Sequence, residues 1–327
     1  MNVDRLCRTV IAAAASGLLG AFGAQGYAQG YPSKPVRMIA PFPPGGSSDL
    51  IARIVAQKLS ERFAHQVIID NRPGAGSNLG SQLAARAAPD GYTLLLTSVT
   101  NAINMTLSRN PGYDLIKDFA PISKLAIGPT ALVVHPSVPA TTVVELIKLA
   151  HARPGQLNYG SGGNGTPSHL SGEMFRHMAK VNIAHVPYKG TGQSVNDLVA
   201  GQIHFVFASM PVAVQHMKTG RLRTLAVTGA QRTPLAPDLP TVAESGLPGY
   251  AFDSWWGLVT NRGVPTPVLN TLSTEVRHVL RLQDVKERFS DLGIDVLQST
   301  PAELASFTRS EIDRLAKIIR ETGMRDD

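Results

Sequence analysis

Short apolar runs and longer amphipathic runs alternate along the first third of the chain. The apolar runs predict strands at 36–42, 67–70 and 93–97. Between the first two, apolar residues recur at helical spacing and predict a helix over 48–63. A second helix is expected from Ser77 or Asn78 to about Ala88. Strands that alternate with helices predict an α/β fold with a parallel sheet and right-handed crossovers.

The same alternation returns in the middle of the chain. Strands are predicted at 130–135, 157–160, 183–186, 203–207 and 222–228, and helices at 143–152, 168–178, 195–200 and 212–218. A short helix is expected at 241–245 and a strand at 250–260, followed by helices at 266–282, 284–292 and 301–321. The first half offers few helices to cover its sheet, so we expect the last helices to pack back on it. This predicts a discontinuous domain I of 31–129 plus 253–327, and a domain II of 130–252.

Residues 1–28 have the pattern of an export signal. Arg5 and Arg8 precede an apolar stretch over 9–22, and the small residues Gly26 and Ala28 predict cleavage after Ala28. The alternative is a buried N-terminal helix, which the Ala/Gly-rich composition and the lack of a polar face disfavour. Cys7 lies inside this segment, so the exported chain is expected to contain no cysteine. Export without disulfides suits a protein of the periplasm.

Composition narrows the class of partner. The 327 residues carry a formal charge of +7, and removal of the signal would leave +6, because that segment holds two arginines and one aspartate. No basic block is interleaved with aromatic residues, so nucleic-acid binding is not expected. A modest positive field favours small anionic ligands. Outside the N-terminal segment no apolar run is long enough to predict a membrane span.

Two glycine-rich loops stand between a predicted strand and a predicted helix, one in each half. The first is Pro43 to Asp49, and the second is Ser161 to Pro167. In the first loop Gly45 and Gly46 are expected to turn the backbone with positive φ. A helix N-terminus presents unpaired N–H groups and the positive end of its dipole, so each loop can hold an anion. The alternative for the first loop is an ordinary turn capped by serine.

The sequence contains parts of motifs for catalysis, cofactor binding and metal binding, but each motif lacks a required residue. The Gly160–Gly165 stretch matches G-x-G-x-x-G, but no carboxylate follows about 20 residues later to bind a ribose. The nine histidines are scattered, and His169 and His177 lie two turns apart on one predicted helix. Asp49 has no second carboxylate or histidine spaced to assist it as a base. We therefore expect no enzyme, no cofactor and no metal, and expect Trp255 and Trp256 in the core.

Several motifs, in order, resemble the Bug-type substrate-binding proteins of tripartite tricarboxylate transporters, a TctC-like family. They are Pro41–Arg53, Asp70–Gly76, Pro89–Thr93, Val186–Gly190, Leu225–Thr228, Asp238–Gly249 and Trp256–Leu258. The resemblance implies a two-domain Venus-flytrap fold of the periplasmic-binding-protein type, each domain a mainly parallel sheet flanked by helices. It also implies an organic acid held in the cleft, transporter membrane components as partners, and a monomer.

The resemblance places the carboxylate on the two loops, largely through backbone N–H groups and ordered waters. The site residues that it implies are Pro44, Gly45, Gly46, Ser47, Asp49, Ser98, Asn101, Gly163, Asn164, Gly165, Thr166, Ser168 and Ser209. Two departures stand out, since His204 and Ala208 occupy positions that are often acidic in the family. These losses of negative charge weakly favour a ligand without a cationic group.

The interpretation from sequence is a periplasmic protein that captures a small organic carboxylate for a transporter. Two alternatives stay open. The same module could feed a sensor kinase, which the sequence does not distinguish, or the chain could be an enzyme acting on small acids, which the missing nucleophile–base pair disfavours.

Overall fold

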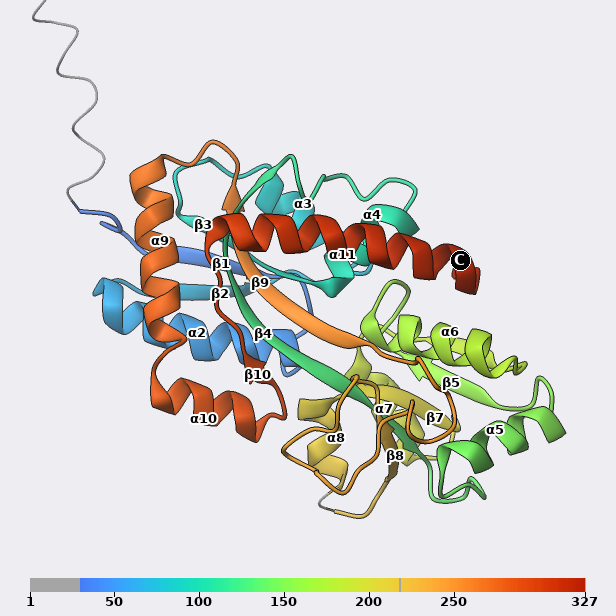
Figure 1. The fold of residues 1–327 in the computed structure, drawn as a ribbon. Coiled ribbons are helices and arrows are strands. Elements are labelled where there is room, and N and C mark those ends of the chain that lie inside the picture. Colours follow the sequence, from blue (N-terminus) through green and yellow to red (C-terminus); the bar gives the residue numbers. More distant parts are fainter. Residues whose placement is uncertain (1–29, 218, 327) are drawn as a thin grey trace, which may run out of the picture.

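The computed structural model describes residues 30–217 and 219–326, so the predicted signal at 1–28 lies outside the described residues. Two groups of strands share one long strand, β4 (Phe119–Val134), which runs through the middle of the molecule (Figure 1). The strand order is β2-β1-β3-β9-β4-β7-β5-β6, with β8 and β10 also paired to β4. The groups are described here as the first and second halves.

The first half begins with the predicted alternation of strands and helices. Its elements are β1 (Val36–Ala40), α2 (Ser47–Phe63), β2 (Val67–Asn71), α3 (Asn78–Ala85), β3 (Thr93–Ser98) and α4 (Val99–Leu107). β1 pairs in parallel with both β2 and β3. The helix α4 was not predicted, because its sequence mixes Thr and Asn with apolar residues and follows the strand without a turn.

Strand β4 links the two halves by changing its partner. From Phe119 to Pro129 it pairs antiparallel with β9 (Asp253–Asn261), and from Thr130 it pairs antiparallel with β7 and β8. The sequence analysis found only the second part of this strand. The first part contains two prolines and a glycine, residues that usually argue against a central strand. Irregularities in the β4–β9 register, near Pro121 and Lys124, accommodate this part of the strand in the sheet.

The second half repeats the alternation around the other end of β4. Its elements are α5 (Val143–Ala152), β5 (Asn158–Ser161), α6 (Pro167–Ala179), β6 (Ala184–Pro187), α7 (Thr191–Val199), β7 (Phe205–Ser209), α8 (Met210–Met217) and β8 (Arg223–Val227). β5 pairs in parallel with β6 and β7, while β4 is antiparallel to its neighbours. The sheets are therefore mixed, and the expectation of mainly parallel sheets is wrong where β4 and β9 lie. The expected helix at 241–245 is a series of turns.

The C-terminal elements are α9 (Thr266–Val279), α10 (Gln283–Asp291), β10 (Asp295–Val296) and α11 (Pro301–Thr322). α9 and α10 pack against α2. α11 starts at a capping box of Thr300 and Glu303 and contacts α4 and β4. Its far end reaches α6, where Arg176 Nη2 donates to the carbonyl oxygen of Thr322 at 3.0 Å (Figure 1). This helix therefore touches both halves.

The cores explain why β9 carries two tryptophans in a row. Successive residues of a strand point to opposite faces. Trp255 is buried in the core shared by α4, α6 and α11, and its Nε1 donates to Glu311 Oε2 at 3.1 Å. Trp256 is buried on the opposite face, against the core of α2 and α9. Within the described residues, no helix combines the length and apolar character that a membrane span needs.

Candidate ligand-binding cleft

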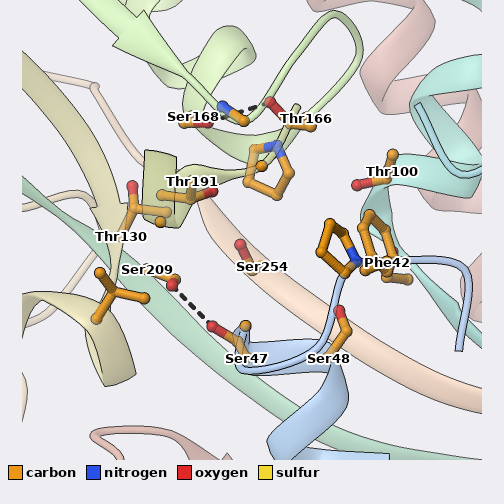
Figure 2. A pocket seen from close by; sticks show the side chains of 18 of the residues that line it. Phe42, Ser47, Ser48, Thr100, Thr130, Thr166, Ser168, Thr191, Ser209 and Ser254 are labelled. Carbon is orange, nitrogen blue, oxygen red and sulfur yellow. Dashed lines mark hydrogen bonds between the residues drawn. The ribbon is translucent and has the colours of Figure 1, made fainter. Parts of the chain in front are cut away.

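A cleft of about 450 Å³ lies between the two glycine-rich loops (Figure 2). Ser47, Ser48 and Thr100 reach it from the first half, and Thr166, Ser168 and Thr191 from the second. Thr130 and Ser254 line it from the central strands. Apolar walls are supplied by Phe42, Pro43, Val99, Pro167, Phe207, Val212 and Trp256. Hydroxyl groups and apolar surface together suit a small organic molecule.

Five helices begin at this cleft. The residues that cap α2, α4, α6 and α7 are Gly46, Ser98, Thr166 and Gly190, and Ser209 immediately precedes α8. All five line the cleft. Each helix start contributes unpaired N–H donors and a partial positive charge. Local sequence predicted two of these helix starts, those of α2 and α6. Ser98 and Ser209 were expected at the site, and the structure shows that they too stand at helix starts, as does Gly190.

The first loop is held in shape from behind by Asp49. Its buried carboxylate accepts hydrogen bonds from the Gly45 amide, Arg53 Nε and Asn71 Nδ2, all at 2.9 Å. Burial alone would raise the pKa of this carboxyl, but the bonds from Arg53, Gly45 and Asn71 outweigh it and lower the pKa. Asp49 does not line the cleft, so its role is to brace the loop.

The two glycines of this loop differ. Gly45 has φ +82°, which favours glycine. Gly46 has φ −80°, so the expectation of positive φ is wrong there. A Cβ at Gly46 would meet a single described neighbour within 4 Å, the Pro43 carbonyl oxygen at 3.8 Å. The backbone at Gly46 therefore tolerates a side chain, and what a side chain would fill is space in the cleft.

The second loop presents only part of its length to the cleft. Gly162, Thr166 and Ser168 line it, and the Gly162 amide donates to Ser168 Oγ at 2.9 Å. Gly163 instead accepts from Thr166 Oγ1 at 2.6 Å through its carbonyl oxygen. Gly165 donates its amide to His169 Nδ1 at 3.3 Å. This loop therefore closes on itself, and its middle faces away from the cleft.

Ser98 and Asn101 have different roles at the start of α4. The Asn101 side chain accepts from the Ser98 amide at 2.9 Å and donates to Ser81 Oγ at 2.8 Å, so it fixes the helix start without lining the cleft. The Ser98 hydroxyl is buried and lines the cleft. It faces the Asn101 backbone amide in a capping box, but forms no full hydrogen bond within the described chain. A ligand atom would complete the bonding of this hydroxyl.

The structure brings most of the expected site residues together. Those that line the cleft are Pro44, Gly45, Gly46, Ser47, Ser98, Thr166, Ser168 and Ser209. Those that do not are Asp49, Asn101, Gly163, Asn164 and Gly165, which support the loops or face elsewhere. Across the cleft Ser47 Oγ donates to Ser209 Oγ at 2.7 Å, which joins the two halves directly (Figure 2).

Sequence reasoning missed the strand residues Thr130 and Ser254 and the segment from Lys189 to Gln193, all of which line the cleft. The motif Val186–Gly190 was a signal for that segment, since it carried the family resemblance. Thr130 and Ser254 gave no signal, because they are reached only where β4 and β9 pass between the halves. Trp256 is buried as expected, but it also lines the cleft and donates to Ser48 Oγ at 2.9 Å.

Charge in the cleft comes from a single side chain. Of the described residues that line it, Lys189 is the one that carries a charge, and none is acidic. His204 and Ala208 do not line the cleft. His204 bonds to Asn158, and Ala208 is fully buried in β7. The argument against a cationic ligand therefore rests on the missing carboxylate in the lining rather than on those two positions.

Comparison with known proteins identifies the family. The profile of the tripartite tricarboxylate transporter family receptor matches residues 51–324. Protein BugT of Bordetella pertussis is 34% identical over 326 residues, covering 99% of each chain. The chain belongs to this receptor family. The resemblance found in the sequence is confirmed, and the chain is accordingly a periplasmic solute-binding receptor by family.

Solved structures agree on the fold. Rpa4515 of Rhodopseudomonas palustris, solved with adipate, has a TM-score of 0.88 and 35% identity, covering 90% of this chain and 99% of that one. MatC of the same organism, solved with bound malate, has a TM-score of 0.84 and 30% identity, covering 88% of this chain and all of that one. The predicted periplasmic-binding-protein fold is thereby confirmed.

Proposed function

We propose that this receptor captures a small organic carboxylate in its cleft and delivers it to a tripartite tricarboxylate-type transporter. The observation that carries the proposal is the convergence of five helix starts on one space whose described lining includes no acidic residue. An anion is favoured there by N–H donors and helix dipoles. The ligands of Rpa4515 and MatC, adipate and malate, support a carboxylate.

The proposed contacts come from backbone and hydroxyl groups. Pro44 to Ser47 and Ser98 would hold the carboxylate from the first half, while Thr166, Ser168 and Ser209 would hold it from the second. Phe42, Phe207 and Val212 would pack on the carbon skeleton. Groups of this kind recognise charge and size more than one particular acid.

We also propose that the halves act as domains, divided at 129/130 and 252/253. Strand β4 exchanges β9 for β7 at this point, since Pro129 pairs with Asp253 and Thr130 pairs with Ser209. A ligand bound to both halves would shift the balance between an open and a closed form. We expect Ser47 and Ser209 to touch in the closed form.

Residues 1–28 are proposed to be a cleaved signal that sends the chain to the periplasm, where it would act as a monomer beside the membrane components of the transporter. The family of receptors supports this location. No catalytic role is proposed, since the described residues that line the cleft include no histidine, cysteine or carboxylate to serve as base or nucleophile.

A carboxylate screen tests the proposal. The mature protein would be heated with dicarboxylates, citrate, acidic amino acids, nicotinate and benzoates, and binding to the folded form would raise the melting temperature. Calorimetry on each hit would give the dissociation constant. If none of these acids raised the melting temperature, the carboxylate assignment would be wrong. Turnover of a hit by catalytic amounts of protein would instead favour an enzyme.

A further inference from the structure

A second cavity, of about 400 Å³, lies on the far side of the second glycine-rich loop. Its wall includes His169, Glu173 and Arg176 of α6, His185 of β6, and Arg325 from the segment that follows α11. The described residues that line this cavity are all different from those that line the cleft. The proposed function does not use it.

Two histidine rings form part of the wall. His169 and His185 are stacked with ring centroids 3.9 Å apart and planes 7° from parallel. His169 accepts the Gly165 amide through Nδ1. A neutral imidazole that accepts through Nδ1 carries its proton on Nε2, so His169 has one N–H left to donate. Burial, with smaller effects of His185 and Arg176, lowers the pKa of His169 to about 3, which keeps the ring neutral.

The balance of charge in the cavity is positive. Among the described residues of its wall, Glu173 is the acidic one. Its carboxylate is already engaged, since it binds Arg176 at 2.6 Å and accepts from Tyr159 at 2.8 Å. Arg325 is exposed and forms no ion pair within the described chain. A guanidinium group that no described carboxylate binds suits an oxyanion.

Hydrogen bonds link the wall of this cavity to the loop that lines the cleft. His185 Nε2 lies 2.6 Å from Ser161 Oγ, and Ser161 Oγ accepts the Gly163 amide at 3.1 Å. His169 reaches Gly165 in the same loop. Both histidines thus hold the back of the loop whose front, at Gly162 and Thr166, faces the cleft. A group bound at the back would change how firmly the front is held.

We propose that this second cavity binds a small oxyanion, either inorganic phosphate or a carboxylate, through Arg325 and His169, and that its occupancy changes the affinity of the cleft. The binding site stands independently of the proposed function, and only the coupling rests on it. Because coupling between two sites is reciprocal, filling the cleft must change the affinity of the second cavity by the same factor.

Inorganic phosphate is the first probe. Its titration into the mature protein, with nitrogen-15 in the histidines, should shift the imidazole signals of His169 and His185. The variant Arg325→Gln should weaken the phosphate affinity about tenfold, which is 1.4 kcal/mol. The matched control is Arg320→Gln, which removes an exposed charge from α11 outside the cavity and should leave the affinity unchanged.

Acetate separates the two sources of oxyanion. It is titrated into the Gly46→Val variant, in which carboxylate binding in the cleft is expected to be more than tenfold weaker. Shifts with acetate and not phosphate identify the group as a carboxylate, and the reverse identifies phosphate. The coupling is measured as the change in the dissociation constant of a carboxylate found by the screen, at saturating phosphate, and we expect at least about fivefold.

The outcomes separate this inference from the proposed function. Absence of histidine shifts with either anion, or equal binding in Arg325→Gln and Arg320→Gln, would overturn the second site even if the carboxylate screen succeeds. Shifts that leave the cleft affinity unchanged would overturn the coupling. A failed carboxylate screen with intact, Arg325-dependent histidine shifts would overturn the proposed function alone.

Discussion

At the scale of single residues, the cleft offers a ligand mostly backbone and hydroxyl groups. Gly46 is a suitable position to test this arrangement. Its φ of −80° suits any residue, and a Cβ there would contact little of the protein. A side chain at this position therefore competes with the ligand rather than with the fold.

Gly46→Val should lower carboxylate affinity by more than tenfold, about 1.4 kcal/mol, with little change in melting temperature. The valine side chain would occupy the space into which the first loop presents its N–H groups. Calorimetry with a carboxylate from the screen measures the loss, and Gly46→Ala, with less volume, should lose less. Unchanged affinity in the valine variant would remove the first loop from the binding site.

Lys189 should matter most for ligands that carry two negative charges. It is the charged residue of the described lining. Its neighbour Gly190 lies close to the first loop, since a Cβ added to Gly190 would be 3.4 Å from Pro43 Cγ. Lys189→Gln should weaken a dicarboxylate several-fold and reduce the effect of salt, while a monocarboxylate changes little. The control Lys148→Gln removes an exposed charge from α5, away from the cleft. An equal loss of affinity for monocarboxylates and dicarboxylates would contradict a role of Lys189 in binding the second negative charge.

Asp49 predicts a pH dependence of stability. Its folded pKa is lowered, so its contribution is fully present above the unfolded value of about 3.9 and is lost as pH falls through the lower folded value. Urea unfolding at several pH values should show a shallower acid loss in Asp49→Asn than in the unmodified protein. Parallel curves for the two proteins would show that Asp49 is not held as described.

The site residues predicted from sequence fall into two groups, those that line the cleft and those that support it from behind. Ser47, Thr166 and Ser168 sit at helix starts, which local sequence marks, and they line the cleft. Asp49 and Asn101 belong to the same helix starts but point backwards, into hydrogen bonds with neighbouring segments. The direction of such a side chain depends on hydrogen-bond partners far along the chain. A local sequence pattern does not identify those partners.

At the scale of elements, loops from the two halves also meet beside the cleft, at residues that do not line it. We define this rim contact by Gly76, Asn104, Asn164 and Gly165. Asn104 Nδ2 donates to the Gly76 carbonyl oxygen and to Asn78 Oδ1, at 2.6 and 2.9 Å. A Cβ at Gly76 would lie 2.8 Å from the Asn164 carbonyl oxygen, and one at Gly165 would lie 2.4 Å from Asn104 Oδ1. Such close approach is possible because both positions are glycine.

Gly165→Ala should therefore weaken carboxylate binding by hindering closure. The backbone there has φ +73°, so alanine also adds strain of about 1–2 kcal/mol. Gly249→Ala supplies the matched control, because φ is +84° and a Cβ meets nothing within 4 Å. Both variants should lower the melting temperature, and only the first should raise the dissociation constant. Equal affinities in the two variants would mean that the rim contact does not support closure.

The elements differ in how far sequence predicts them. Strands β1 and β3 and helix α11 follow from local pattern, since periodicity and caps lie within each segment. The first part of β4 does not, because Pro121, Gly128 and Pro129 argue against a strand and only pairing with β9 forms it. The site depends on that pairing, since β4 and β9 carry Thr130 and Ser254 into the cleft.

At the scale of the whole molecule, several contacts besides the rim contact join the two halves. β4 and β9 cross between them, α11 reaches α6 through Arg176, and Ser47 contacts Ser209 over the cleft. Sequence predicted that the chain leaves the first half and returns to it, because the C-terminal helices needed a sheet to cover. It gave no sign of the contact between Ser47 and Ser209, which are 162 positions apart.

This contact allows a direct test of closure. If the signal is removed, the exported chain has no cysteine, so an introduced pair has no competitor. The hydroxyl oxygens of Ser47 and Ser209 are 2.7 Å apart, so the sulfur atoms of cysteines at these two positions would lie close enough to meet in a disulfide. The double variant Ser47→Cys, Ser209→Cys should form this bond on oxidation and hold the halves together.

Oxidation should then stop exchange of a carboxylate between the cleft and solution, because the ligand enters and leaves only when the halves part. Ligand loaded before oxidation should be retained through dialysis, and ligand added afterwards should give no heat on titration. A reductant should restore exchange. Each single variant shows what loss of one hydroxyl does to affinity, so the effect of the cross-link is the difference between the oxidised and reduced double variant. Equal exchange rates in those two states would mean that ligand passes in and out without separation of the halves.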